Sequence, residues 1–235
     1  MTGRTPPPEQ VYATVEEADQ HGADWLADAI LESVAQRGRC AIAVSGGRSP
    51  WPMFAILAER DDLPWDRIIL FQVDERIAPE GDEDRNLTHL KSNLLSQRPE
   101  LEVHTHPMPV NDEDLNAACR RYEQLLEEAC GSPPSLDIVH LGLGPDGHTA
   151  SLVPEDSVLQ VHDRDVDLTG GEYQGRRRMT LTYPCINRAQ RIMWQIVGEG
   201  KSSALRQMRA GDPSMPGSAI STEQAVIFAD AAAAD

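Results

Sequence analysis

Residues 136–154 read LDIVHLGLGPDGHTASLVP, and this stretch indicates the class of fold. The apolar run 136–141 is rich in β-forming residues, whereas the glycines and the proline that follow it cannot continue a strand or a helix. A strand that ends in a glycine-rich loop marks the edge at which open α/β sheets bind ligands, beyond the carboxyl ends of the strands. The loop also carries four reactive side chains, namely Asp146, His148, Thr149 and Ser151. We therefore expect a functional site at this loop.

Apolar runs and amphipathic segments alternate along the rest of the chain. Short apolar runs predict strands over 40–44, 66–73, 102–108, 179–182, 192–197 and 225–229. Helical spacing of apolar residues predicts helices over 15–36, 50–60, 87–95, 111–129 and 202–209. Ser49 and Asn111 are expected to cap two of these helices. Strands that alternate with helices predict an α/β fold, in which helices cover both faces of a mostly parallel sheet.

The sequence has no internal repeat and no linker, so we expect a single domain over residues 1–235. Residues 1–10 are polar and proline-rich, which predicts a flexible arm, and residues 230–235 are expected to form a short tail. The segment 156–178 contains charges and glycines but no hydrophobic period. That pattern predicts a long excursion near the site or a flexible flap.

The composition limits the possible partners. A formal net charge of −17 is unsuited to nucleic acid and to anionic membranes, so we expect neither as a partner. No apolar run approaches the length of a membrane span, and the first ten residues lack the apolar core of a signal peptide. The four cysteines have no C-x-x-C spacing, and the contexts of Cys40 and Cys185 indicate core residues. We expect a cytoplasmic protein with reduced thiols.

Four loops at predicted strand ends carry polar side chains. In a parallel sheet these ends share one edge, so the loops converge; they are Ser45–Gly47, Asp74–Arg76, Asp146–Thr149 and Gly198–Lys201. In the first loop, two glycines precede a helix N-terminus, where backbone N–H groups can hold an anion. We interpret Ser45, Gly46 and Gly47 as a phosphate cradle, and an ordinary turn before a helix is the alternative.

Two basic residues occur at these corners. Lys201 lies in a Gly-x-Gly-Lys turn before a helix, where an ammonium group adds charge to the backbone amides, although most lysines are simply solvated. Arg76 follows Asp74 and Glu75 at a strand end. A guanidinium group that a carboxylate orients there could face a phosphate or an oxyanion, and a solvated corner is the alternative.

His148 lies beside Asp146 in the glycine-rich loop. Imidazole is a natural general base near neutral pH, and a neighbouring carboxylate can fix its tautomer. A loop histidine that bonds its own backbone is the alternative. Because catalytic groups concentrate on loops of this kind, we interpret His148 as a catalytic base.

Two further patterns have plainer interpretations. His104 and His106 could place two imidazoles on one face of a strand, but no acid or cysteine is spaced to complete a metal site. A surface edge strand is the simpler interpretation. The basic run Arg176–Arg178 could reach an anionic ligand, although a solvated loop face is more usual for such a run.

Taken together, these motifs resemble the soluble, Rossmann-like 6-phosphogluconolactonase family. The segment 136–154 is the most specific match, and the other matches are individually weak. The matching pieces occur in family order and are Ser45-Gly46-Gly47-x-x-Pro50, Asp74-Glu75-Arg76, Asn86, Gly142 to Leu152, Arg178 to Thr182 and Gly198-x-x-Lys201.

The resemblance implies a Rossmann-like α/β fold similar to that of sugar-phosphate isomerases and deaminases. It also implies hydrolysis of 6-phosphoglucono-δ-lactone in the oxidative pentose phosphate pathway, with neither a metal nor a cofactor. The expected catalytic residues are His148, Asp146 and Arg76. The residues expected to bind substrate or phosphate are Ser45, Gly46, Gly47, Asp74, Thr149 and Lys201. We expect a phosphorylated sugar lactone as the partner and a monomer or weak homo-oligomer.

The sequence departs from the family pattern in three places. Arg48-Ser49 replaces the usual Ser-Thr, Arg85 replaces a serine, and the Pro-Pro that often precedes the Arg178 strand is absent. Two rival functions also remain. A deaminase or isomerase would continue after the Asp-Gly-His motif with Ile-Ala-Phe-Asn-Glu, whereas this chain continues with Thr149 to Leu152. A sugar-phosphate sensor would carry a basic DNA-binding segment, and none precedes residue 40.

Overall fold

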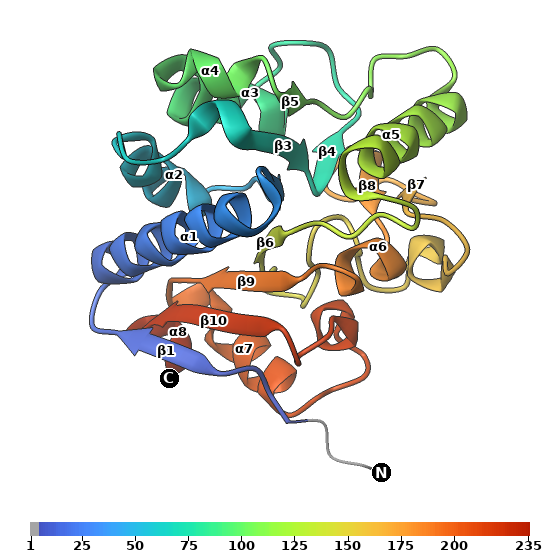
Figure 1. The fold of residues 1–235 in the computed structure, drawn as a ribbon. Helices are drawn as coiled ribbons and strands as arrows, with labels where there is room; N and C mark the ends of the chain where they lie inside the picture. Colours follow the sequence, from blue (N-terminus) through green and yellow to red (C-terminus); the bar gives the residue numbers. More distant parts are fainter. Residues whose placement is uncertain (1–4) are drawn as a thin grey trace.

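The structure, a computed structural model, describes residues 5–235, and two β-sheets lie within that range (Figure 1). All strand pairs of the larger sheet are parallel, which confirms the predicted sheet. Its order is β1 (Glu9–Tyr12), β10 (Ala225–Asp230), β9 (Arg191–Ile196), β6 (Ile138–Gly142), β2 (Cys40–Val44), β3 (Ile68–Gln72) and β5 (Thr105–His106). The smaller sheet is antiparallel, in the order β4 (Asp74–Arg76), β8 (Arg178–Leu181) and β7 (Val166–Leu168).

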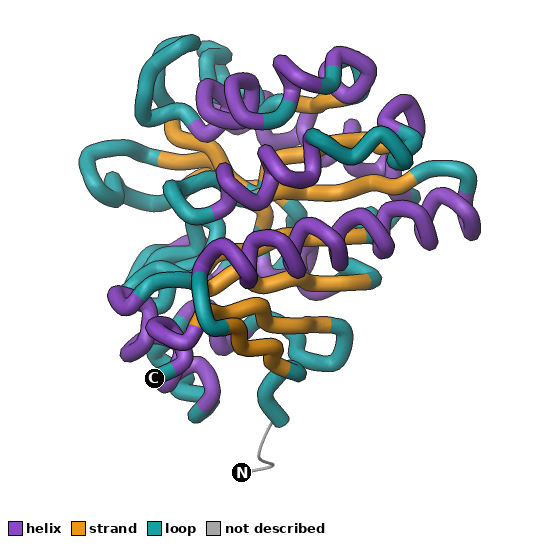
Figure 2. The backbone as a smooth tube through the Cα atoms, turned by 90° about the vertical axis from the view of Figure 1, so that its left-hand side faces the viewer, coloured by secondary structure: helices purple, strands orange, loops and turns teal. Residues whose placement is uncertain are grey.

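Helices cover both faces of the larger sheet, as predicted. One face packs against α1 (Val15–Arg37), α2 (Pro50–Ala58), α3 (Asn86–Asn93) and α4 (Pro99–Glu102), and Figure 2 shows α1 running across it. The other face packs against α5 (Leu115–Cys130), α6 (Tyr183–Asn187), α7 (Ser202–Arg209) and the smaller sheet. Alternation along β2 makes this possible, because Ile42 faces one core while Ala41 and Ala43 face the other. No helix in residues 5–235 is long and apolar enough to cross a membrane.

Capping residues fix both ends of α1 and the start of α5. Thr14 caps α1 by accepting the Glu17 N–H, and Gly38, at φ 75°, ends the helix. The predicted cap at Asn111 is wrong, because Asp114 accepts the Ala117 N–H and begins α5. Asn111 lies outside that helix, and its side-chain amide donates to the carbonyl of Ala78.

Both predicted terminal segments need correction. Residues 1–4 of the expected arm lie outside the described range, but Glu9–Tyr12 is an edge strand that pairs with β10. Arg209 anchors this strand through an ion pair with Glu9. At the other end, Asp230 caps α8 (Ala231–Ala234), whose Ala233 is fully buried. Backbone pairing fixes residues 9–12, and packing of Ala233 fixes the C-terminal turn. Neither kind of contact leaves a hydrophobic period in the sequence.

The segment 156–178 is an ordered excursion, with β7 forming one edge of the smaller sheet. The Asp74–Arg76 corner is likewise a strand of this sheet, since β4 pairs with β8. The strand predicted over 102–108 shrinks to Thr105–His106, because α4 occupies the residues before it.

A buried ion pair fixes β4 against α3. Glu75 is fully buried and its Oε2 atom lies 3.1 Å from Nε of Arg85, which is 3% exposed. The same carboxylate accepts the N–H groups of Asn86 (2.8 Å) and Leu87 (2.9 Å) at the start of α3. Arg85 therefore has a structural role at the position where the resembling family usually has serine.

Replacing Arg85 by alanine is expected to lower the free energy of unfolding by about 3–5 kcal/mol, because it leaves the Glu75 charge buried without its partner. Urea denaturation measures the change. Arg67→Ala is the control: its ion pair with Asp66 is solvent-exposed, and its loss is expected to cost less than about 1 kcal/mol. Equal effects of the two substitutions would contradict this role for Arg85.

Candidate active site

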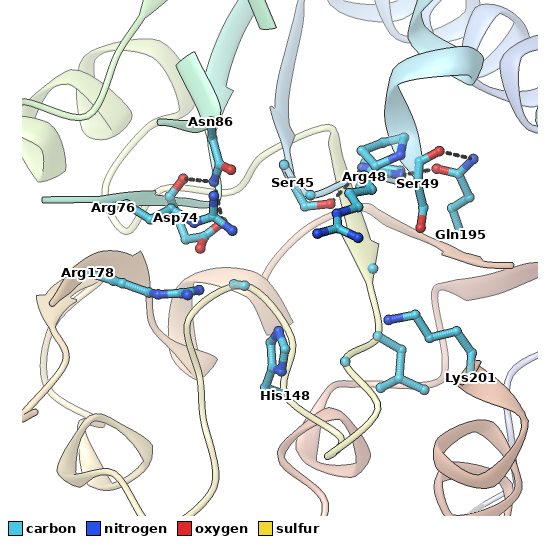
Figure 3. Close-up of a pocket in the computed structure, with 18 residues that line it drawn as sticks. Ser45, Arg48, Ser49, Asp74, Arg76, Asn86, His148, Arg178, Gln195 and Lys201 are labelled. Carbon is cyan, nitrogen blue, oxygen red and sulfur yellow. Dashed lines mark hydrogen bonds between the residues drawn. The ribbon is translucent and has the colours of Figure 1, made fainter. Parts of the chain in front are cut away.

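A cleft lies at the carboxyl ends of four neighbouring strands, β9, β6, β2 and β3 (Figure 3). The predicted convergence of the loops is therefore correct. Most of the predicted site residues line the cleft, namely Ser45, Gly46, Gly47, Asp74, Arg76, His148 and Lys201. Five further side chains, outside the predicted set of site residues, also line the cleft: Arg48, Asn86, His140, Arg178 and Gln195.

The loop after β2 brings its backbone to the cleft. A Cβ atom at Gly46 would lie 2.0 Å from Oδ1 of Asn86, so only glycine allows this close packing. Gly47 has φ +100°, which also favours glycine. The helix α2 begins directly after the loop, and its first residue, Pro50, lines the cleft. Ser49 makes no side-chain capping bond, so its predicted capping role is wrong.

His148 forms a hydrogen-bonded group with two other side chains. Its Nδ1 atom lies 2.6 Å from Oδ1 of Asp146. The Tyr173 hydroxyl donates to Oδ2 of Asp146 (2.8 Å) and lies 3.1 Å from the same imidazole nitrogen. Burial acts to raise the pKa of Asp146, but the bonds from His148 and Tyr173 outweigh it and hold that pKa well below its usual range. The imidazole is thus oriented by an ionised carboxylate.

Gly144 is needed for this orientation. A Cβ atom there would lie 2.0 Å from Nδ1 of His148 and 2.7 Å from Oδ1 of Asp146. Gly144→Ala is expected to displace His148, the predicted base. For the lactone hydrolysis that the sequence motifs imply, kcat is expected to fall by roughly 100-fold, the cost of moving a catalytic group by about 1 Å. Steady-state kinetics test this. The control, Gly171→Ala, has nothing within 4 Å of its added methyl group and is expected to retain activity. Unchanged kcat in the Gly144 variant would show that the group tolerates displacement.

Two arginines lie on one side of His148 (Figure 3). Arg178 is 3% exposed, and its guanidinium carbon lies 4.9 Å from the centre of the Tyr173 ring. Within residues 5–235, the Nε atoms of Arg178 and Arg76 are buried without a hydrogen-bond acceptor. The solvated loop face predicted for the basic run is therefore wrong for Arg178. It suits Arg176, which pairs with acidic residues at the surface.

Lys201 and Arg48 lie on the opposite side of the cleft (Figure 3). Lys201 ends a short 3₁₀ turn, Glu199–Lys201, that leads into α7. Burial lowers the pKa of Lys201, while the charge of Asp146 acts in the opposite direction. Two cations beside a glycine-rich loop are an arrangement that can bind an anion.

Two predicted binding residues have other contacts. Thr149 is 1% exposed and does not line the cleft, and its hydroxyl donates to the carbonyl of Gly142 (2.9 Å). This bond closes the loop that carries His148. Asp74 lines the cleft, but its carboxylate accepts from Ser151 (2.6 Å) and Asn86 (3.2 Å). Both residues therefore hold the loops of the site together.

Some of the missed residues had a signal in the sequence. His140 and Gln195 are polar residues inside the apolar runs of β6 and β9, and a polar group in a buried strand requires a partner. Arg178 begins a short strand-like segment, which separates it from the preceding arginines. Tyr173 lies in an aperiodic segment, and nothing in the sequence connects it with the glycine-rich loop.

Comparisons with known proteins agree with this architecture. Residues 13–228 match the family described as Glucosamine-6-phosphate isomerases/6-phosphogluconolactonase. The chain is 38% identical over 185 residues to the 6-phosphogluconolactonase of Synechocystis sp., covering 77% of this chain and 76% of that protein. It is 34% identical over 195 residues to the 6-phosphogluconolactonase of Streptomyces coelicolor, covering 77% and 75% of the two proteins.

Solved structures with low sequence identity share the fold. The 6-phosphogluconolactonase from Thermotoga maritima has a TM-score of 0.85 at 22% identity, with 95% of this chain and 99% of that chain covered. A monomeric glucosamine-6-phosphate deaminase has a TM-score of 0.82 at 22% identity, covering 97% and 98%. The fold alone therefore accommodates both lactonases and deaminases.

The parallel sheet of this chain is the fold that 6-phosphogluconolactonases and a glucosamine-6-phosphate deaminase share. The chain belongs to the glucosamine-6-phosphate isomerase/6-phosphogluconolactonase family. The resemblance that the sequence motifs suggested is confirmed.

Proposed function

We propose that the protein hydrolyses 6-phospho-D-glucono-1,5-lactone to 6-phospho-D-gluconate, the second step of the oxidative pentose phosphate pathway. The observation that carries this proposal is the placement of His148. Its Nδ1 atom is bonded to Asp146, and its ring points into a cleft that has cations on both sides (Figure 3). The sequence relatives described above carry the same activity in their names.

His148 serves as the general base in the proposed mechanism. Because Asp146 accepts the Nδ1 proton, Nε2 has a lone pair that can take a proton from water. The water oxygen then bonds to C1 of the lactone, and the carbonyl becomes a tetrahedral oxyanion. When the bond between C1 and the ring oxygen breaks, the imidazolium returns its proton to that oxygen. One residue thus serves both half-steps.

One side of the cleft binds the phosphate of the substrate, and the other side stabilises the oxyanion that forms at C1 during the reaction. The backbone of residues 45–47 and the ammonium group of Lys201 bind the 6-phosphate, beside the start of α2. Arg76 and Arg178 stabilise the oxyanion. Support for this arrangement comes from Tyr173, because its ring contacts both Arg178 and His148. Binding energy at the phosphate then positions the lactone for attack.

Parallel assays test this proposal against its rivals. The expected result is acid release from freshly prepared lactone at fixed pH, faster than spontaneous hydrolysis, with no ammonia released from glucosamine 6-phosphate. Ammonia release without lactone turnover would favour the deaminase that shares the fold. Binding of both compounds without turnover would favour a sensor.

Several expectations from the sequence stay predictions. They concern the single domain, the monomeric or weakly associated state, the cytoplasmic location, and activity without a metal or a cofactor. The absence of nucleic-acid and membrane partners is likewise a prediction. Sedimentation at assay concentrations and turnover after dialysis against a chelator test two of them directly.

A further inference from the structure

A buried chain of polar side chains runs from the cleft into the core. Oγ of Ser45 lies 3.1 Å from Nδ1 of His140, and Nε2 of that imidazole lies 3.3 Å from Oε1 of Gln195. The Gln195 amide nitrogen donates to Asp19 on α1 and to the carbonyl of Ser49 (3.5 Å). Ser45, His140, Gln195 and Asp19 are each at most 5% exposed. The proposed hydrolysis uses none of the three inner residues.

The ends of this chain determine the direction of every hydrogen bond in it. An ionised carboxylate and a backbone carbonyl can only accept, so the Gln195 amide nitrogen must face Asp19 and Ser49. Its oxygen then faces His140, and Nε2 must carry the imidazole proton. A neutral imidazole with Nε2–H accepts at Nδ1. The Ser45 hydroxyl therefore donates inward, and only its lone pairs are directed to the cleft.

The protonation states agree with this assignment. Burial raises the pKa of Asp19 to about 6, with the Gln195 bond opposing the rise and the charges of Glu16 and Asp230 adding to it. The carboxylate is ionised at pH 7.5. Burial lowers the pKa of His140 to about 4, although its bond to Gln195 acts the other way. The imidazole is neutral at the same pH, and it is too weak a base to activate Ser45 as a nucleophile.

We propose that Asp19, through Gln195 and His140, holds the neighbouring serine hydroxyl as a hydrogen-bond acceptor toward the cleft. Ser45 then binds a hydroxyl group of the sugar ring and not the phosphate. A phosphate dianion offers only acceptors, whereas each ring hydroxyl offers a proton. The inference rests on the proposed lactone substrate and changes the predicted role of Ser45. Asp19, Gln195 and His140 are positioning residues, and Ser45 is a specificity residue.

The imidazole tautomer tests the relay without any substrate. In ¹⁵N-histidine-labelled protein at pH 7.5, ring ¹⁵N shifts are expected to show a protonated Nε2 and an unprotonated Nδ1 for His140, assigned from the signals missing in a His140→Gln variant. Gln195→Lys places a group that can only donate beside Nε2, so the proton is expected to move to Nδ1. A protonated Nδ1 in the wild type, or an unchanged tautomer in a folded Gln195→Lys variant, would overturn the proposal.

Substrate analogues test which group the serine binds. Ser45→Ala is expected to lower kcat/KM for the lactone by about tenfold, the upper range for one hydrogen bond. With one of the 2-, 3- or 4-deoxy lactones the same substitution is expected to have no effect, because the contacted hydroxyl is already absent. Ser151→Ala removes a buried hydroxyl outside the relay and is expected to affect all four lactones equally.

Inorganic phosphate separates this proposal from the proposed function. Its dissociation constant, measured by calorimetry, is expected to change less than twofold in Ser45→Ala. Weakening of phosphate binding by tenfold, with equal losses on every lactone, would return Ser45 to the phosphate site. If the wild-type protein turned over no lactone, the proposed function would fail. The tautomer and the phosphate titration would still decide how Ser45 is oriented.

Discussion

Replacing His148 by alanine is expected to lower kcat for lactone hydrolysis by at least ~100-fold, the usual scale for a lost general base. KM is expected to change little, because the groups proposed to hold the phosphate lie on a different side of the cleft. Acid release at constant pH measures both constants, after subtraction of the spontaneous rate.

A second histidine provides the control for this experiment. His106 stacks on Phe71 with ring centres 4.9 Å apart and does not line the cleft, so His106→Ala is expected to retain kcat. Tyr173→Phe removes one bond to Asp146 but leaves the bond between His148 and Asp146, and a loss smaller than that of His148→Ala is expected. Near-normal turnover in His148→Ala would refute the assignment of the base.

Replacing Lys201 by alanine is expected to raise KM for the phosphorylated lactone by roughly 10- to 100-fold, because a charge-assisted bond to an anion contributes about 1.5–3 kcal/mol. Turnover of unphosphorylated gluconolactone is expected to stay almost unchanged. The comparison of the two substrates by steady-state kinetics isolates the phosphate.

Lys91 provides the control for this substitution. Its side chain is exposed, and its Nζ atom lies 3.6 Å from Oε1 of Glu80. Lys91→Ala removes the same charge from the surface and is expected to leave both substrates unaffected. Equal losses on both lactones in Lys201→Ala would mean that the residue does not recognise the phosphate.

Most of the strands and helices of the larger sheet could be predicted because each one leaves a hydrophobic pattern within a short stretch of sequence. The runs around Ile42 and Val139 are apolar on both faces, which is the pattern of a strand that is buried between two helical layers. Once the sheet is parallel, the loops after its strands must share an edge. The spacing of Asp146 and His148 then sufficed to predict the pair that lies 2.6 Å apart.

The features that could not be predicted from the sequence depend on contacts between residues that are far apart in the chain. Tyr173 reaches Asp146 across 27 residues, and Gln195 reaches Asp19 across 176 residues. The edge strand β1 depends on pairing with β10, the last strand along the chain. No periodicity records such contacts, since each requires the whole fold to bring its partners together.

The most direct test of the account is the structure of the complex with the product, 6-phosphogluconate. The predicted result has the phosphate against the backbone of residues 45–47 and the ammonium group of Lys201. The C1 carboxylate is then within hydrogen-bond distance of Nε2 of His148, with Arg76 and Arg178 beside it. A product bound with its phosphate on those two arginines, or outside this cleft, would contradict the account.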